Sequence, residues 1–373
     1  MNSDRREAMH AFLGEAGWSG ATLSPLPGDA STRRYVRLQR DGAGAMLMDQ
    51  PQEAEAPQSP ANATTEQRRA FGYNAVARLA GADCGRFVAV AEFLRGRGLS
   101  APTVYAADVK NGFVLIEDFG DDLYASALAN GDAGEEPELY DAAIDALAQL
   151  HMQAAPRALG DHKELYAYDE TALLAEADLM TEWFIPLALG RAAGDEERDE
   201  HRTLWRDALR PVGTASSVFV HRDYHAQNLF WLPQREGAAR AGMIDFQDAV
   251  AGAPSYDLVS LVEDARRDVS AELAEAMTQR YIAARRKLNA AFDAEGYRAQ
   301  AAVMAAQRNA KIAGIFARLY KRDSKARYLS YLPRVWNYLE HDLQHPALAP
   351  LKRWYDRKIP AEVRHQRITG EAA

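Results

Sequence analysis

The chain has 373 residues, of which 47% are hydrophobic and 26% charged, a composition typical of a globular protein with room for two lobes. A net charge of −9 and the lack of a long basic stretch argue against nucleic acid as a partner. Neither an apolar signal segment nor a run of about 18 apolar residues is found, so we expect no membrane association. Because Cys84 is the single cysteine, no internal disulfide forms, and we expect a cytoplasmic protein.

The first third of the chain is predicted to be rich in strands. Residues 33–40 and 44–51 have strand-like apolar patterns and flank Asp41-Gly42, a pair that favours a two-residue hairpin turn. Residues 87–97 have helical spacing and end at a glycine. The other elements predicted here are a loop at 51–60 and strands at 102–108 and 112–118.

Helical patterns dominate after the second of these strands. Residues 137–153, for example, place apolar side chains at intervals of three and four. The change of character near residues 117–120 predicts an amino-terminal lobe over residues 1–117 and a carboxy-terminal lobe over residues 118–373. The predicted fold class is therefore α+β, with a small strand-rich lobe followed by a larger, mainly helical one.

The stretch "HRDYHAQN", residues 221–228, interrupts an apolar run that resembles a strand. Asn228 follows Asp223 at a spacing of five, which is the spacing of a kinase catalytic loop. Phosphoryl transfer needs a carboxylate that receives the proton of the acceptor hydroxyl, and oxygen ligands for a metal ion on the phosphates. The pattern predicts the first role for Asp223 and a metal-ligand role for Asn228. The plainer alternative is a polar turn between two strands.

A second acidic position follows in "GMIDFQDA", residues 242–249. Here an apolar strand pattern ends at Asp245, so its carboxylate is expected at a strand end, where oxygen ligands commonly hold hard cations. A hairpin between Asn228 and Asp245 would bring the two metal ligands together. No histidine pair has the spacing of a zinc site, so Mg²⁺ is the expected metal.

These two segments, together with "FVLIEDFGDD" at 113–122, resemble the aminoglycoside phosphotransferase and choline kinase superfamily. The resemblance covers nearly the whole chain and implies the bilobal protein-kinase-like fold, ATP as phosphate donor and Mg²⁺. A narrower resemblance is to bacterial anomeric kinases of N-acetylmuramic acid and N-acetylglucosamine, which serve cell-wall recycling. It implies phosphorylation of the C1 hydroxyl of an amino sugar. The segments that carry it are "GDASTRRYVRL", "LMDQP", "IDFQDAVAGAPSYDLVSL" and "KIAGIFARLYKRDSKARYLSYLPRVWNYL".

Two other functions stay open from the sequence. One is a kinase of aminoglycosides or of small amino alcohols such as choline, whose cationic acceptors call for an acidic or aromatic pocket. The other is a nucleotide-binding module without catalysis, because the third strand has Met46, Met48 and Asp49 but lacks the lysine with which kinases pair phosphates. Glu92 on the next helix is accordingly a poor candidate for that ion pair. The oligomeric state is not indicated by the sequence.

The resemblance implies a phosphate-covering loop in "GDASTRR", residues 28–34. There the hydroxyls of Ser31 and Thr32 would contact phosphate oxygens. Either Arg33 or Arg34 would supply the missing positive charge, or Mg²⁺ would bear more of it. A plain hairpin turn is the alternative.

The same resemblance makes the segment near residue 117 the hinge between the lobes. The backbones of Glu117 and Phe119 would hydrogen-bond the adenine edge, while Phe113, Leu115 and Ile116 would face its ring. Without the resemblance, an ordinary strand that ends in a turn explains this segment equally well.

Contacts to the acceptor are predicted in the carboxy-terminal lobe. His225, Gln227 and Asp248 flank the catalytic segments, and Glu176 and Trp183 lie on the helical pattern at 169–190, where the indole could stack on a sugar face. Each has a structural alternative, such as core packing for Trp183 and a solvent-facing turn for Asp248.

A later helical pattern is expected to show four basic residues outward, one of which would meet the carboxylate of N-acetylmuramic acid. Solvation of an exposed helix face is the alternative. Asp257 opens another helical pattern and is predicted to be a helix cap. The resemblance implies a similar structural part for it, in which it braces the catalytic loop. The four basic residues are Lys311, Arg318, Lys321 and Arg322.

Overall fold

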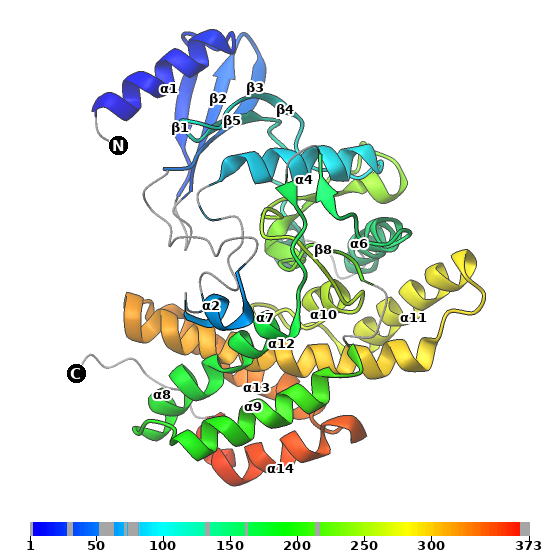
Figure 1. The fold of residues 1–373 in the computed structure, drawn as a ribbon. Coiled ribbons are helices and arrows are strands. Elements are labelled where there is room, and N and C mark those ends of the chain that lie inside the picture. The colour runs from blue at the N-terminus through cyan, green and yellow to red at the C-terminus, as the bar shows by residue number, and fades with distance from the viewer. Residues whose placement is uncertain are drawn as a thin grey trace.

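The computed structural model consists of a strand-rich amino-terminal part and a larger helical part, as Figure 1 shows. The predicted α+β class and the order of the two parts are confirmed. The structure describes residues 3–27, 33–51, 63–70, 73, 81, 83–130, 135–160, 163–212 and 217–365. Within these residues, no helix combines the length and apolarity needed to cross a bilayer.

A five-stranded antiparallel sheet forms the amino-terminal part, in the order β1-β2-β3-β5-β4. The predicted hairpin between β2 and β3 is present, and its turn residues Asp41 and Gly42 have φ angles of 52° and 81°. An aspartate and a glycine are among the few residues that adopt this conformation readily. The strands are β1 (Thr22–Pro25), β2 (Arg34–Arg40), β3 (Ala43–Asp49), β4 (Val104–Asp108) and β5 (Phe113–Ile116).

The two faces of this sheet pack against different helices (Figure 1). Helix α1 (Ser3–Glu15) covers one face and forms an apolar cluster with Phe113 and Leu115. Helix α4 (Cys84–Gly96) packs on the other face, toward Val114 and Ile116, because successive side chains of a strand point to opposite sides. The prediction that Phe113 and Leu115 face an adenine ring is therefore wrong, since both point away from the helical part.

Four short strands carry the central loops of the helical part. Strand β8 pairs with β11, and β9 pairs with β10, both antiparallel. The β9–β10 pair is the hairpin that was predicted. The bounds of the strands in this part are β6 (Ala158–Leu159), β7 (Lys163–Glu164), β8 (Val218–Val220), β9 (Leu229–Trp231), β10 (Ala241–Met243) and β11 (Val250–Gly252).

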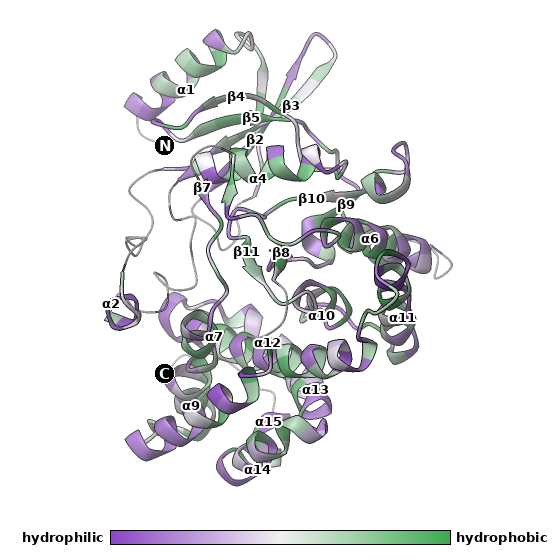
Figure 2. Ribbon diagram, turned by 45° about the vertical axis from the view of Figure 1, so that its right-hand side comes forward, coloured by the Kyte–Doolittle hydropathy of each residue, from purple (hydrophilic) through white to green (hydrophobic). Residues whose placement is uncertain are grey.

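Helices surround these strands, and hydropathy colouring shows green and purple alternating around many of them (Figure 2). The predicted helix at 169–190 is divided into α7, a π-helical turn η1 and α8. The helices are α2 (Thr65–Ala70), α5 (Tyr124–Asn130), α6 (Glu136–Leu150), α7 (Glu170–Ala177), η1 (Met180–Phe184), α8 (Ile185–Leu189), α9 (Asp195–Leu209), α10 (Tyr256–Val262), α11 (Ala271–Leu288), α12 (Ala294–Asp323), α13 (Leu332–Asp342), α14 (Ala349–Lys358) and α15 (Ala361–Arg364), with 3₁₀ turns η3 (Ala226–Asn228), η4 (Gly237–Arg240), η5 (Ala326–Tyr331) and η6 (Pro346–Leu348).

Helix α2 lies on the helical part although it belongs to the segment between β3 and α4 (Figure 1). Arg68 of α2 forms an ion pair with Asp169, whose carboxylate also caps α7 by accepting from the Ala172 N–H at 3.0 Å. The amino-terminal third of the chain therefore contributes residues to the region around α7.

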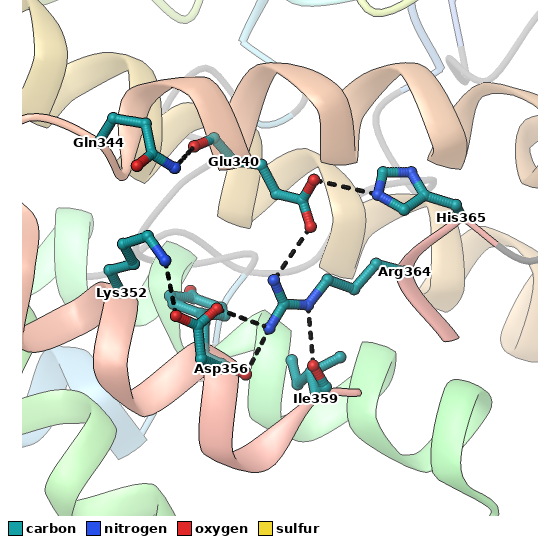
Figure 3. Close-up of polar contacts among 8 residues, drawn as sticks. Glu340, Gln344, Lys352, Asp356, Ile359, Arg364 and His365 are labelled. Atoms are coloured by element: carbon teal, nitrogen blue, oxygen red, sulfur yellow. Dashed lines mark hydrogen bonds and ion pairs between the residues drawn. The ribbon is translucent and has the colours of Figure 1, made fainter. Parts of the chain in front are cut away.

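The carboxy-terminal helices are held together by Arg364 (Figure 3). Its buried guanidinium contacts Glu340 of α13 at 3.0 Å and Asp356 of α14 at 3.1 Å, and donates to the carbonyl of Ile359 at 2.8 Å. His365 contacts the second oxygen of Glu340 at 3.0 Å. One arginine thus fastens α15 to the two preceding helices.

Candidate active site

The hairpin of β9 and β10 brings Asn228 and Asp245 to the same end of the two strands. Leu229 faces Met243 in the register, and the Ile244 N–H donates to the carbonyl of Asn228 at 3.1 Å. Asn228 directly precedes β9, and Asp245 follows β10 after one residue. The predicted hairpin between the two candidate metal ligands is confirmed.

The loop that carries Asp223 is held by Asp257. One carboxylate oxygen accepts from the His221 N–H at 2.7 Å, and the other accepts from the Arg222 N–H at 2.9 Å. Arg222 has a φ of 75°, a conformation that is costly for a residue other than glycine and that persists only where the surroundings enforce it. Burial raises the pKa of Asp257 to about 7, against the effect of the two N–H donors. The predicted cap is wrong, because Ser255 occupies the N-cap of α10, but the predicted bracing of the loop is present.

The side chain of Arg222 lies in a buried charge network. Its guanidinium contacts Glu176 at 2.8 Å, and Lys311 contacts the same carboxylate at 3.1 Å. Tyr168 donates a hydrogen bond to the other carboxylate oxygen. Burial alone would raise the pKa of Glu176, but the two cations outweigh it and lower that pKa. Lys311 is buried, so the prediction that it points outward is wrong.

Asn228 presents its amide in a defined orientation. Its Nδ2 donates to the carbonyl of Asp223 at 2.9 Å, which leaves Oδ1 as the side-chain atom for a cation. Oxygen atoms of this kind, with the carboxylate of Asp245, suit Mg²⁺. Among the described residues, no group of three or more His, Cys, Asp and Glu side chains gathers as a metal site.

Asp245 lies between a cation and an amide. Arg33 Nη2 is 3.0 Å from Oδ1 of Asp245, and Gln247 Nε2 donates to the same oxygen at 2.9 Å. Burial tends to raise the pKa of Asp245, but Arg33 and the Gln247 hydrogen bond outweigh it, so the pKa is lowered and the side chain is a carboxylate at neutral pH. Its φ of 62° is a second strained position at this site.

Of the two arginines that were predicted to replace the missing lysine, the structure brings Arg33 to Asp245. Arg34 lies on β2 and approaches Asp49 at 3.9 Å, beside Arg5 of α1, which donates to Asp49 at 2.7 Å. Ser31 and Thr32 lie outside the described residues, so their contacts to phosphate stay predictions.

The predicted hinge is braced from both parts of the chain. The Glu117 N–H donates to the Thr103 carbonyl at 2.8 Å, and the Glu117 carboxylate pairs with Arg235 of the loop after β9. The Phe119 ring packs edge-on against Phe230, with 5.6 Å between the ring centroids. The Glu117 N–H is thus engaged in the sheet, and the contacts of both backbones to adenine stay predictions.

One residue of the site was missed in the sequence. Arg86 of α4 is buried and donates to the carbonyls of Gln247, Ala249 and Glu164, each at 2.8 Å. A single basic residue within the otherwise apolar start "CGRFVAVA" was the available signal. Glu92 on the same helix is exposed, in agreement with its rejection as the partner of a lysine.

The five predicted acceptor contacts lie in different surroundings. Gln227 is exposed, whereas His225 is buried, and burial lowers the pKa of its imidazole. Asp248 is half-buried near Arg222, which contacts its carbonyl at 3.3 Å. The carboxylate of Glu176 is fully buried in the charge network, which does not favour a contact to a sugar.

Trp183 lies on the π-helical turn η1, half-buried beside α12. The two elements approach closely at Gly314, where a Cβ atom would lie 2.5 Å from the Cβ of Leu179. Arg318, one turn further along α12, places its guanidinium 6.0 Å from the Trp183 ring centroid and 5.0 Å from that of Tyr73. A π-helical turn is often found at functional sites, so this cluster of Tyr73, Trp183 and Arg318 is the candidate acceptor surface.

Comparison with known proteins gives consistent results. The profile of the phosphotransferase enzyme family matches residues 22–291. The N-acetylmuramate/N-acetylglucosamine kinase of Caulobacter vibrioides is 44% identical over 371 residues, which are 98% of this chain and 99% of the relative. The kinase with the same name from Pseudomonas aeruginosa is 32% identical, and the match covers 91% of this chain and 90% of the relative.

Solved structures share the fold at much lower identity. An aminoglycoside phosphotransferase in complex with gentamicin is 13% identical, with a TM-score of 0.55 over 93% of this chain and 98% of its own. The ethanolamine kinase of Plasmodium vivax is 12% identical, with a TM-score of 0.53 over 91% of this chain and 84% of its own. The kinase-like fold is therefore established, and the chain belongs to the phosphotransferase enzyme family.

Proposed function

We propose that this protein transfers the γ-phosphoryl group of ATP to the C1 hydroxyl of N-acetylmuramate or N-acetylglucosamine. The observation that carries the proposal is the convergence of Asp223, Asn228 and Asp245 at one end of the β9–β10 hairpin, on two braced loops. The acceptor is inferred from relatives of nearly equal length whose names include both sugars.

In this proposal, Asp223 is the catalytic carboxylate. It is half-buried, and its loop is fixed by Asp257 before any substrate binds. The sugar hydroxyl oxygen bonds to the γ-phosphorus while the bond from phosphorus to the bridging oxygen of ADP breaks, and Asp223 takes up the hydroxyl proton. Fixed geometry of this kind lowers the entropic part of the barrier.

Asn228 and Asp245 would hold Mg²⁺, which neutralises charge on the phosphates when it is bound. Arg33 provides the positive charge that a third-strand lysine supplies in other kinases, because its guanidinium already lies beside Asp245. Ser31, Thr32, Arg34 and the backbones of Glu117 and Phe119 complete the proposed nucleotide contacts, with residues 1–117 as the nucleotide-binding lobe and 118–373 as the catalytic lobe. The reaction is proposed to take place in the cytoplasm.

On the acceptor side, we assign the carboxylate of N-acetylmuramate to Arg318. Lys311 is buried in the charge network with Glu176 and Tyr256, and Lys321 and Arg322 are exposed. Arg318 is half-buried between two aromatic rings, which orient a planar guanidinium for a carboxylate and offer a face to a sugar ring.

The experiment is ADP release by the purified protein with ATP and Mg²⁺ across N-acetylmuramate, N-acetylglucosamine, glucosamine, choline and kanamycin. We expect strong stimulation by the two N-acetylated sugars. Stimulation by kanamycin or choline alone would overturn the acceptor while leaving the phosphoryl-transfer chemistry in place. No stimulation by any of them, together with tight nucleotide binding, would favour the module without catalysis.

A further inference from the structure

The geometry points to Arg86 as a positioning residue that fixes the loop of residues 245–249 and thereby the affinity for the metal ion. The inference rests on the proposed role of Asp245 as a metal ligand. Arg86 does not contact the carboxylate of Asp245. It holds the backbone that follows, and it does so from helix α4, an element separated from the loop by about half the chain.

The contacts of Arg86 leave little freedom in that loop. Nε donates to the carbonyl of Gln247, Nη2 to that of Ala249 and Nη1 to that of Glu164, each at 2.8 Å. The intervening carbonyl, that of Asp248, is contacted by Arg222 at 3.3 Å. Three successive carbonyls of the loop, those of residues 247, 248 and 249, are therefore held by two buried guanidinium groups.

The loop needs this restraint because Asp245 is strained. With a φ of 62°, its backbone relaxes toward ordinary conformations unless the neighbouring residues prevent it. The side chain of Gln247 donates to the Asp245 carboxylate, so fixing the Gln247 backbone also orients the amide that faces the metal ligand. The ring of Phe87, next to Arg86, stacks on that of Phe246 at 4.8 Å and adds an apolar restraint.

Only an arginine fits these contacts. Its planar group offers donors in divergent, fixed directions, whereas a lysine offers three donors from a single atom. Burial lowers the pKa of Arg86, and Asp248, Tyr166 and Asp83 oppose this. The guanidinium also lies over the Tyr166 ring, 4.9 Å from its centroid. A buried cation whose hydrogen bonds go to neutral carbonyls is expensive, which argues that its position serves the loop.

This arrangement replaces a link that the chain lacks. In protein kinases, a third-strand lysine and a glutamate of the next helix connect that helix to the phosphates. Here the strand has Met46 and Met48, and Glu92 of the helix is exposed. Arg86 instead connects helix α4 to the proposed metal ligand through the loop backbone.

The test compares wild type with Arg86→Lys in two measurements. The first is calorimetric binding of ADP at a series of Mg²⁺ concentrations, which needs no acceptor, and the second is the Mg²⁺ dependence of turnover. We expect the Mg²⁺ concentration for half-maximal ADP binding to rise about tenfold, as for other residues that orient metal ligands from outside the ligand set. The acceptor KM should change less than about twofold, since Arg86 holds the metal side of the site.

The matched control is Arg97→Lys, at the end of the same helix, where the guanidinium lies over the Phe93 ring. It should bind ADP and Mg²⁺ as wild type does. If Arg86→Lys fails to fold, Arg86→Gln carries the test, because the shorter neutral side chain also removes the guanidinium contacts to the carbonyls of Gln247 and Ala249. It should shift the Mg²⁺ dependence in the same direction, by about tenfold or more.

Two results would separate the inference from the proposed function. Unchanged Mg²⁺-dependent ADP binding by Asp245→Asn would overturn the role of Asp245 and the inference with it. A loss in Asp245→Asn together with wild-type behaviour of Arg86→Lys, or of Arg86→Gln where the lysine variant does not fold, would overturn the inference alone.

Discussion

The two sides of the candidate site are built in different ways. On the catalytic side, short loops at strand ends carry Asp223, Asn228 and Asp245, and buried charged residues hold the backbones of these loops. On the acceptor side, Tyr73, Trp183 and Arg318 come from three separate segments and are half-buried. The proposed chemistry thus depends on a rigid arrangement, whereas the proposed choice of acceptor depends on side chains at the surface of packed helices.

The largest expected effect tests the catalytic side. Asp223→Asn keeps the shape of the loop and removes the proton acceptor, so kcat should fall by about 10²–10⁴. ADP binding in the presence of Mg²⁺ should stay within about twofold, because the lost contact forms mainly in the transition state. Steady-state kinetics and calorimetry measure both quantities. Turnover near that of wild type would remove Asp223 from the mechanism.

A second change tests whether rigidity matters as much as the reacting group. Asp257→Ala leaves the N–H groups of His221 and Arg222 without their acceptor in the interior, which should lower the free energy of unfolding by about 2–6 kcal/mol. At a temperature where the variant is folded, kcat should still fall, since the loop loses its brace. Urea unfolding and kinetics check the two effects. Normal stability and turnover would mean that the loop keeps its conformation without Asp257.

The acceptor side should change selectivity instead of rate. Arg318→Gln should raise the KM for N-acetylmuramate about tenfold, the value of one charge-assisted hydrogen bond. N-acetylglucosamine lacks the carboxylate, so its kinetics should change less than about twofold by the same reasoning. Lys321→Gln on the exposed face of α12 is the matched control. An equal effect on both sugars would contradict recognition of the carboxylate.

The smallest expected effect is on the pH dependence of stability. It comes from a buried polar group in the helical core that has no proposed catalytic role. The Asn309 amide donates to Glu263 at 2.6 Å and to Asp342 at 2.9 Å. Burial raises the pKa of Glu263 to about 7, and burial together with Glu263 raises that of Asp342.

Protonation of this pair stabilises the folded state, because the folded pKa values lie above those of the unfolded chain, about 4. The contribution of this pair to the free energy of unfolding is highest below about pH 4 and is lost as pH rises toward about 7. Glu263→Gln should flatten part of this decline, measured as urea midpoints at pH 5, 6, 7 and 8. A decline identical to that of wild type would show that the pair is not the cause, and Asp257 would then be the next candidate.

The arrangement of the loops that carry Asp223, Asn228 and Asp245 was predictable from the sequence because these residues are close in the chain. Asp223 and Asn228 are five residues apart, and the hairpin that joins Asn228 to Asp245 is short, so spacing and strand patterns were sufficient to predict that they meet. The sheet of the first lobe was predicted for the same reason, through the hairpin at Asp41-Gly42.

Contacts between distant segments were not predictable in this way. Arg86 donates to carbonyls 161 and 163 residues away. Every residue has a backbone carbonyl, so the type of the accepting residue gives no sign of such a contact. Lys311 was expected on the surface because helical spacing predicts which residues share a face of a helix but not what packs against that face. The buried Glu176 with which it pairs lies on another helix. The prediction for Phe113 and Leu115 failed for the same reason. Which face of β5 is open to a nucleotide depends on which helix covers each face of the sheet.

The central claim is phosphorylation at C1, and the most direct test is nuclear magnetic resonance of the product formed from N-acetylmuramate, ATP and Mg²⁺. The account predicts a phosphorus signal coupled to the anomeric proton, loss of the reducing end of the sugar, and one ADP for each phosphorylated sugar. A phosphorus signal coupled instead to the protons at C6, with the reducing end intact, would contradict it.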